Sequence, residues 1–154
     1  MLIKLYEPYD QAPVVAASRN DAIVCRQPLA PEHDLVVKWV ADQFTAGWAS
    51  EVRAALGNRP ISIWIAMRSS LLIGFCCYDA IARGFVGPIG VADSERNCGI
   101  GAKLLSACLQ DMRTMGYGYA IVGGVGAPDF FRKVAGAIEI TGSTPGMYRG
   151  MLKP

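Results

Sequence analysis

The spacing of apolar residues divides the first part of the chain into short extended segments followed by helices. Apolar side chains recur at helical spacing over residues 35–44 and again over 48–56, with charged residues between them. This spacing predicts two consecutive helices, the second ending at Gly57 or Asn58. Three shorter segments precede them: an apolar run at 2–5, a weak helix at 12–18 and a strand candidate at 22–25.

From residue 60 the apolar period falls to two, which is typical of strands. Residues 61–67 and 71–78 are predicted to form a β-hairpin. A third apolar run, Phe85 to Val91, contains Gly87 and Pro88, which disfavour a regular ladder. We therefore expect a bulge there, at which backbone groups are left free to receive a ligand.

The last third of the chain carries one long helical pattern and several short elements. The predicted elements are a helix at 101–115 that stops at Gly116, a strand at 119–122, a short helix at 128–134, and a closing hairpin at 138–141 and 147–152 with a type II turn at Pro145-Gly146. Hairpins outnumber strand-helix-strand crossovers. The sequence therefore predicts an α/β (α+β) fold with a mixed, largely antiparallel central sheet flanked by helices.

Composition supports one folded domain over residues 1–154. The 154 residues are 52% hydrophobic and 18% charged, which argues against disorder. No apolar run approaches the roughly 20 residues that a membrane-spanning helix requires. The N-terminal residues include Lys4, Glu7 and Asp10 and do not resemble a secretory signal, so we expect a cytoplasmic protein that does not bind membranes.

The charged and metal-ligating residues exclude two further classes of function. A formal net charge of +2 with scattered basic residues lacks the basic patch of a nucleic-acid-binding protein. The single histidine, His33, has no cysteine near it in sequence, and no C-x-x-C pair occurs, so we expect no metal site. The five cysteines are expected to be free thiols: Cys25, Cys76, Cys77, Cys98 and Cys108.

The segment from Arg96 to Ala102 has the composition of an anion-binding turn. Gly99 and Gly101 allow the backbone to turn tightly, and the following helix presents N–H groups with no intrahelical partner. Together these groups predict an anion cradle, with Arg96 at its entrance screening a pyrophosphate or orienting the loop. A purely structural helix-start turn is the alternative interpretation.

Two other glycine motifs fit this chain less well. A Walker A loop, G-x-x-x-x-G-K-S/T, needs a hydroxyl residue after the lysine, but Leu104 follows Lys103. A dinucleotide fingerprint needs a third glycine, and neither Gly99-Ile100-Gly101 nor Gly124-Val125-Gly126 has one at the required spacing. A nucleotide-binding function is therefore a remote alternative.

The series Arg96-x-x-Gly99-x-Gly101 matches the pyrophosphate loop Q/R-x-x-G-x-G/A of the GNAT superfamily of acyl-CoA-dependent N-acyltransferases. The setting is also similar, because a bulged strand ending at Val91 precedes the loop and an apolar helix follows it. Residues 130–137 resemble the family segment F-Y-x-K-x-G-F with one inserted residue. The resemblance covers about residues 22–152, which leaves the first twenty residues as an addition.

The resemblance implies how acetyl-CoA, or another acyl-CoA, would bind as co-substrate. In GNAT proteins the fourth strand splays from the fifth, and the pantetheine pairs with free backbone groups in the gap. Ile89 and Val91 occupy the matching positions. The backbone amides of the loop would hold the pyrophosphate: Asn97, Cys98, Gly99, Ile100, Gly101 and Ala102. Cys98 is interpreted as a spectator thiol, since no histidine lies nearby in sequence to activate it.

The catalytic side chains are where this sequence departs from its relatives. The tyrosine that often protonates the leaving thiolate is Phe131 here, and the fourth strand carries no carboxylate to act as base. Tyr148 is our candidate general acid, with Tyr78, water or unassisted departure of the thiolate as alternatives, and Tyr148 also fits a core tyrosine. Asp79 is our candidate general base, and a solvated turn residue is the competing interpretation.

The acceptor should approach between the early helices and the closing hairpin, where Trp48, Glu51 and Tyr148 are expected to contribute. The implied reaction transfers an acyl group, acetyl by default, to a primary amine of a small molecule or peptide, by direct attack in a ternary complex. A non-catalytic acyl-CoA sensor is the alternative, since the usual tyrosine and glutamate are missing. Small domains of this kind often pair through edge strands, so a homodimer is compatible with the sequence.

Overall fold

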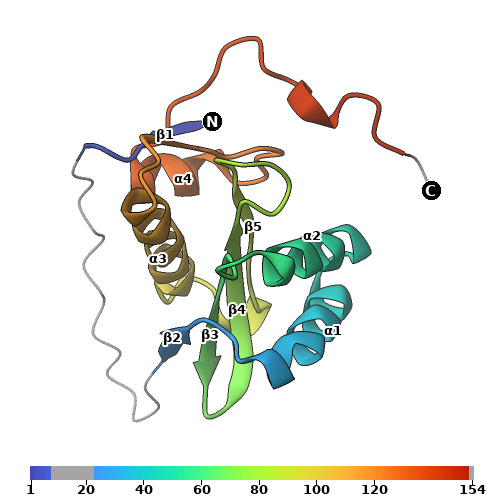
Figure 1. The fold of residues 1–154 in the computed structure, drawn as a ribbon. Helices are drawn as coiled ribbons and strands as arrows, with labels where there is room; N and C mark the ends of the chain where they lie inside the picture. Colours follow the sequence, from blue (N-terminus) through green and yellow to red (C-terminus); the bar gives the residue numbers. More distant parts are fainter. Residues whose placement is uncertain (8–22, 153–154) are drawn as a thin grey trace.

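The computed structural model describes residues 1–7 and 23–152, and the helix expected at 12–18 lies outside them. Helices α1 (His33–Gln43) and α2 (Ala46–Gly57) cover one face of the central sheet. Helices α3 (Ile100–Thr114) and α4 (Pro128–Ala135) lie on the other face. Figure 1 shows the sheet between these two helical layers, as expected for a mixed α/β fold.

The strands form two short antiparallel sheets. The larger sheet has the order β2-β3-β4-β5 and the smaller one pairs β1 with β6. The strands are β1 (Leu2–Lys4), β2 (Val24–Arg26), β3 (Ile63–Arg68), β4 (Leu71–Tyr78), β5 (Val86–Val91) and β6 (Tyr119–Ile121). The predicted hairpin is confirmed as β3–β4, in which Ile65 pairs with Phe75.

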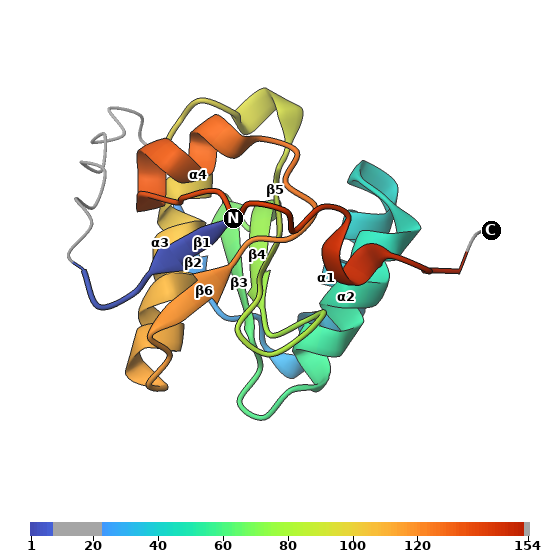
Figure 2. The same cartoon turned by 90° about the horizontal axis from the view of Figure 1, so that it is seen from above.

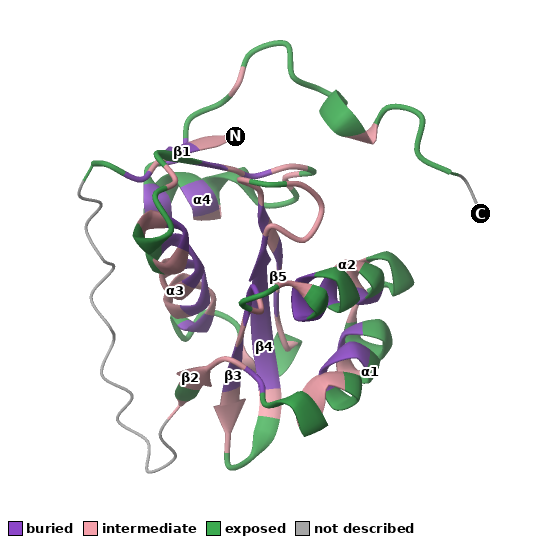
Figure 3. Ribbon diagram, in the orientation of Figure 1, coloured by how far each residue is buried: buried purple, intermediate pink, exposed green. Residues whose placement is uncertain are grey.

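Alternation along β4 separates two hydrophobic clusters. Phe75 and Cys77 point to the α1–α2 layer, whereas Cys76 and Tyr78 point to the α3–α4 layer, because successive side chains of a strand face opposite sides. All four are buried, and Figure 3 shows β4 in purple between the two layers. The sheet is therefore an internal layer whose two faces meet different helices.

Strands β5 and β6 touch at one end only. A parallel bridge joins Phe85 to Ile121, whose N–H donates to the carbonyl of Gly84 at 2.8 Å. Beyond this point β5 continues its pairing with β4, while β6 pairs with β1 on its other side. Among the residues that the structure describes, one edge of β5 therefore has no neighbouring strand beyond this bridge, which agrees with the splayed pair that the family resemblance implied.

The expected bulge in β5 is present. Cys76 pairs with Ile89 and Tyr78 pairs with Val86, so Gly87 and Pro88 together oppose the single residue between Cys76 and Tyr78. Proline has no N–H to donate to the ladder, which explains why the irregularity falls at this position.

The predicted closing hairpin is wrong. Residues 138–141 and 147–152 form no strand pair, and the segment instead contains a short 3-10 helix, Gly146–Tyr148. Only Ile138 pairs, in an isolated bridge with Leu2 of β1, and β1 occupies the edge of β6. Positive φ angles at Gly142, Gly146 and Gly150 interrupt any regular strand, so the segment crosses the top of the molecule as an irregular strap (Figures 1 and 2).

Candidate functional site

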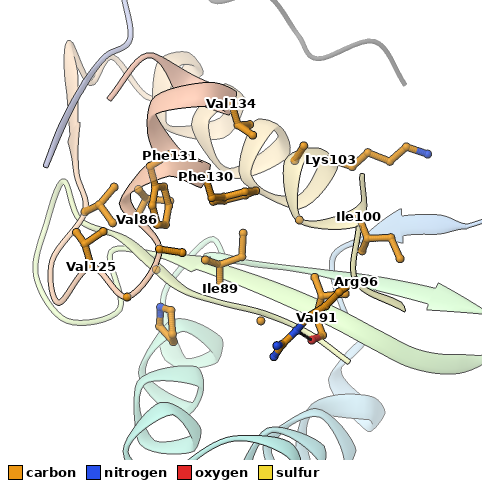
Figure 4. Close-up of a pocket in the computed structure, with 18 of the residues that line it drawn as sticks. Val86, Ile89, Val91, Arg96, Ile100, Lys103, Val125, Phe130, Phe131 and Val134 are labelled. Atoms are coloured by element: carbon orange, nitrogen blue, oxygen red, sulfur yellow. Dashed lines mark hydrogen bonds between the residues drawn. The ribbon is translucent and has the colours of Figure 1, made fainter. Parts of the chain in front are cut away.

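A large cavity lies where β5 and β6 diverge. It measures about 1230 Å³ and is lined by the free edge of β5, the start of α3, the exit of β6 and the inner faces of α2 and α4. Figure 4 shows Ile89 and Val91 of β5 facing Phe130, Phe131 and Val134 of α4 across this space. The cavity is thus open along the strand edge whose backbone groups have no neighbouring strand.

The glycine loop closes one end of the cavity. Gly99 is the N-cap of α3 and has φ +76°, in the left-handed region that favours glycine. The amides of Ile100, Gly101 and Ala102 lie in the first turn, where helix geometry leaves N–H groups without intrahelical acceptors. All residues from Arg96 to Ala102 line the cavity, so the amides of this loop border a space that a ligand can enter.

Arg96 holds the loop rather than reaching freely into the cavity. Its Nε–H donates to the Val91 carbonyl at 3.3 Å, and its Nη2 lies 2.7 Å from Asp93 Oδ1. A second ion pair, between Arg68 of β3 and Glu95, fixes the same turn with an N–O distance of 2.9 Å. These contacts favour the loop-orienting role among the two that the sequence left open for Arg96.

Cationic side chains gather on the α3–α4 side of the cavity. Lys103 follows the loop in the first turn of α3, and Lys133 of α4 also lines the cavity. Lys103 is near the N-terminus of α3, and Lys133 is in the last turn of the neighbouring helix α4. This end of the cavity therefore combines unpaired amides, a helix N-terminus and positive charge, which together suit a phosphorylated ligand.

The opposite end of the cavity is aromatic and carries one carboxylate. Phe44 and Trp48 stack with ring centroids 5.2 Å apart, and Phe44 covers Gly90 of β5 so closely that an added Cβ would lie 2.6 Å from its ring. Glu51, one turn after Trp48 on α2, lines the same wall. Burial raises the pKa of Glu51 above its ordinary value.

The strap brings Tyr148 over this end. Its ring lies against Gly123 just beyond β6, where an added Cβ would be 2.5 Å from the tyrosine hydroxyl oxygen. Burial raises the pKa of Tyr148, and the negative field of Glu51 raises it further. The structure therefore brings Trp48, Glu51 and Tyr148 to one end of the cavity, although the hairpin expected to carry Tyr148 is absent.

Asp79 lies elsewhere. It is not among the residues that line the cavity, and both its carboxylate oxygens accept hydrogen bonds, from the Gly84 N–H and the Tyr117 hydroxyl, each at 2.7 Å. Asp79 itself has φ +50°, as aspartate often has in turns. These contacts close the turn before β5 and favour the turn-residue interpretation of Asp79.

Replacing Asp79 by Asn is expected to leave the pH profile of kcat/KM unchanged, because Asp79 does not line the cavity, and the amide oxygen can still accept one of the two hydrogen bonds that close the turn. The loss of the other bond should lower the free energy of unfolding by about 1 kcal/mol. Rate measurements across pH, combined with urea unfolding, test this. If the fall of kcat/KM on acidification disappears in the variant, Asp79 is the general base.

Two further residues lie as their sequence positions suggested. Phe131, at the position where the family resemblance implied a tyrosine, is buried and lines the cavity, so it offers an apolar wall without a proton donor. Cys98 is exposed in the loop. Among residues 1–7 and 23–152, no cluster of three or more His, Cys, Asp or Glu side chains is placed to hold a metal ion.

Two contacts of the site escaped sequence reasoning. Phe44 seals the wall beside Gly90, and the Phe130 ring lies 3.4 Å from where a Cβ of Gly101 would be. In the sequence, Phe44 was one apolar position of a helical pattern, and Phe130 was part of the segment that resembles the family. Each contact joins a glycine to an aromatic ring on an element that is distant in sequence. The sequence alone therefore does not indicate which ring contacts which glycine.

The strands β5 and β6 diverge, and a glycine-rich helix start lies at the end of the gap between them. This arrangement is that of an acyltransferase-like α/β protein. The chain belongs to the acetyltransferase (GNAT) family, whose model matches residues 33–136. A search of curated proteins gives no match. No helix in the described part of the chain has the length and apolar character needed to cross a bilayer.

Solved structures share this fold at low sequence identity. A GNAT family acetyltransferase from Brucella melitensis in complex with acetyl-CoA has 16% identity and a TM-score of 0.55, and the match covers 71% of this chain and 81% of that one. The aminoglycoside N-acetyltransferase AAC(6')-Iy in complex with CoA has 17% identity and a TM-score of 0.57, covering 76% and 86%. A GCN5-related N-acetyltransferase from Sphaerobacter thermophilus has 18% identity and a TM-score of 0.64, covering 86% of this chain but 45% of its own length.

Proposed function

We propose that this protein transfers an acetyl group from acetyl-CoA to a primary amine by direct attack within a ternary complex. The observation that carries the proposal is the placement of the Arg96–Ala102 loop at the end of the gap between β5 and β6. Membership of the GNAT acetyltransferase family supports the reaction class. Structural neighbours with acetyl-CoA and CoA support the choice of co-substrate.

The residues around the gap fit CoA in both charge and shape. Space is open around Gly99, where a Cβ would meet nothing within 4 Å, and the loop amides offer donors to a pyrophosphate. The free edge of β5 offers the backbone groups of Ile89 and the N–H of Val91 to a pantetheine arm, as an added strand would use them, while the Val91 carbonyl accepts from Arg96. The remaining cavity beyond β5 leaves room for the acceptor.

Three tasks fall to the chain during transfer. The acceptor must lose a proton, the thioester carbonyl must be polarised, and the leaving sulfur must be stabilised. Backbone N–H groups near Val91 are suited to the second task because this edge of β5 has no partner strand. Tyr148 is suited to the third, since it lines the cavity and its hydroxyl can donate a hydrogen bond to the sulfur.

A sensor that binds acyl-CoA without turnover is the second candidate. The observation that favours it is Phe131, an apolar residue lining the cavity where relatives carry their proton donor. The two candidates agree on CoA binding and differ on whether an amine releases free thiol.

The test is a thiol-release assay with acetyl-CoA and a panel of amines, run beside thermal unfolding with and without CoA. We expect CoA to raise the unfolding temperature and at least one amine to release thiol. A CoA-induced rise without amine-dependent release across the panel would favour the sensor. Absence of any CoA effect would overturn the proposed function.

A further inference from the structure

The acceptor end of the cavity contains a carboxylate that no described residue neutralises. Glu51 lines the cavity and is half-buried, yet none of the hydrogen bonds or ion pairs among residues 1–7 and 23–152 involves its carboxylate. Burial raises the pKa of this carboxylate, so its charge is less favourable here than in water, and a bound cation would offset that cost. The position therefore suits a cationic ligand.

The other carboxylate and the arginine that line the cavity already have ion-pair partners. Glu95 is paired with Arg68, and Arg96 with Asp93. The lysines Lys103 and Lys133 belong to α3 and α4, on the opposite face of the sheet from α2. The cavity is thus positive on the α3–α4 side and has one uncompensated negative group on the α2 side.

The wall next to Glu51 is aromatic. Trp48 precedes Glu51 by three residues and so lies on the same side of α2, and Phe44 stacks on Trp48. Both rings are only partly buried and line the cavity. Aromatic faces attract both apolar groups and cations.

We infer that Glu51 binds the ammonium group of the acceptor, and that the acceptor is a primary amine with an apolar, aromatic arm that packs on Phe44 and Trp48. This inference rests on the proposed function and names the substrate class of the same site. The single unpaired carboxylate fits one ammonium group, so a polyamine would bring charges that no lining group offsets. An amino acid would bring its own carboxylate toward Glu51, which repels it.

The same carboxylate is placed to take the proton that the amine must lose. Two neighbouring titratable groups are close enough to interact with the charge of Glu51, namely Tyr148 and Cys77. Burial raises the pKa of both groups, so both are uncharged near neutral pH. Burial also raises the pKa of Glu51, which makes it a stronger base than an exposed glutamate. The ammonium proton passes to Glu51 and from there to solvent, and the freed nitrogen forms the bond to the thioester carbon. When the C–S bond breaks, the second proton of the nitrogen passes to the thiolate, directly or through the Tyr148 hydroxyl, which ends the step protonated.

The test compares Glu51→Gln with the wild type, using 2-phenylethylamine as probe. We expect kcat/KM for this amine to fall about 30-fold, in line with loss of a charge-assisted contact, while KM for acetyl-CoA is unchanged. The fall of kcat/KM on acidification through the Glu51 pKa should disappear in the variant. Because Gln removes a half-buried charge that has no partner among the described residues, the variant should unfold at the same or a higher temperature.

Matched ligands and a matched variant separate the causes. Isothermal titration into the CoA-saturated wild type should give tighter binding of 2-phenylethylamine than of 2-phenylethanol, spermidine or glycine, and Glu51→Gln should remove the preference over 2-phenylethanol. Asp34→Asn, an exposed acid on α1 outside the cavity lining, should change none of these values. Equal binding of amine and alcohol, or an unchanged kcat/KM in Glu51→Gln, would overturn the inference. If thiol release continues in that case, the proposed function stands.

Discussion

Replacing Gly99 by Glu is expected to abolish the CoA-induced rise in unfolding temperature and to lower kcat/KM for acetyl-CoA by about 100-fold or more. Gly99 caps α3 at φ +76°, and the space where a side chain would project is open and lines the cavity. The new carboxylate would therefore stand in the anion cradle, and like-charge contacts of this kind cost several kcal/mol. Thermal unfolding with CoA and steady-state rates give both readouts.

Gly136→Glu is the matched control for this variant. Gly136 also has a positive φ, +59°, and also has nothing within 4 Å of an added Cβ, but it ends α4 and does not line the cavity. It should share the backbone strain of about 1 kcal/mol without the loss of CoA binding. Equal losses in the two variants would mean that strain, and not the cradle, explains the effect at Gly99.

The sequence was most informative where local chemistry decides the conformation. Helical spacing predicted α1, α2 and α3 within a few residues, and the period of two predicted β3 and β4. The glycines of the loop predicted a tight turn at a helix start, and in the structure Gly99 caps α3 with φ +76°. These features depend on neighbouring residues only, so one sequence suffices to find them.

Prediction failed at the sheet edge, where distant segments compete. The runs 138–141 and 147–152 and the turn residues Pro145-Gly146 were compatible with a hairpin, but β1 already pairs with β6 and leaves that segment only the bridge between Ile138 and Leu2. No local signal in Leu2–Lys4 indicates which strand it joins. Strand pairing of this kind is set by tertiary contacts and not by propensity.

The acceptor end was predicted as a set of residues but not as an arrangement. Trp48, Glu51 and Tyr148 were expected on this side from the family resemblance, and they line one cavity. That Glu51 has no partner within residues 1–7 and 23–152 and that Tyr148 rests on Gly123 follow only from the packing of α2, β6 and the strap. A carboxylate in a helical pattern looks the same whether it faces solvent or a ligand.

The contact between Tyr148 and Gly123 provides a second route to the role of this tyrosine. Gly123→Ala would place a Cβ 2.5 Å from the tyrosine hydroxyl oxygen, so the ring must move, and the exposed strap lets it move at little cost. We expect the free energy of unfolding to change by less than about 0.5 kcal/mol. If Tyr148 stabilises the leaving sulfur, kcat should fall by about 100-fold, as it should in Tyr148→Phe.

The double variant decides whether the two substitutions act through one group. Once the hydroxyl is gone, displacing the ring has nothing further to remove, so Gly123→Ala combined with Tyr148→Phe should be no slower than either single variant. Gly118→Ala, next to the same strand but with nothing within 4 Å of its Cβ, should keep the wild-type rate. Full activity in Tyr148→Phe would remove the tyrosine from the mechanism and leave departure of the sulfur to water.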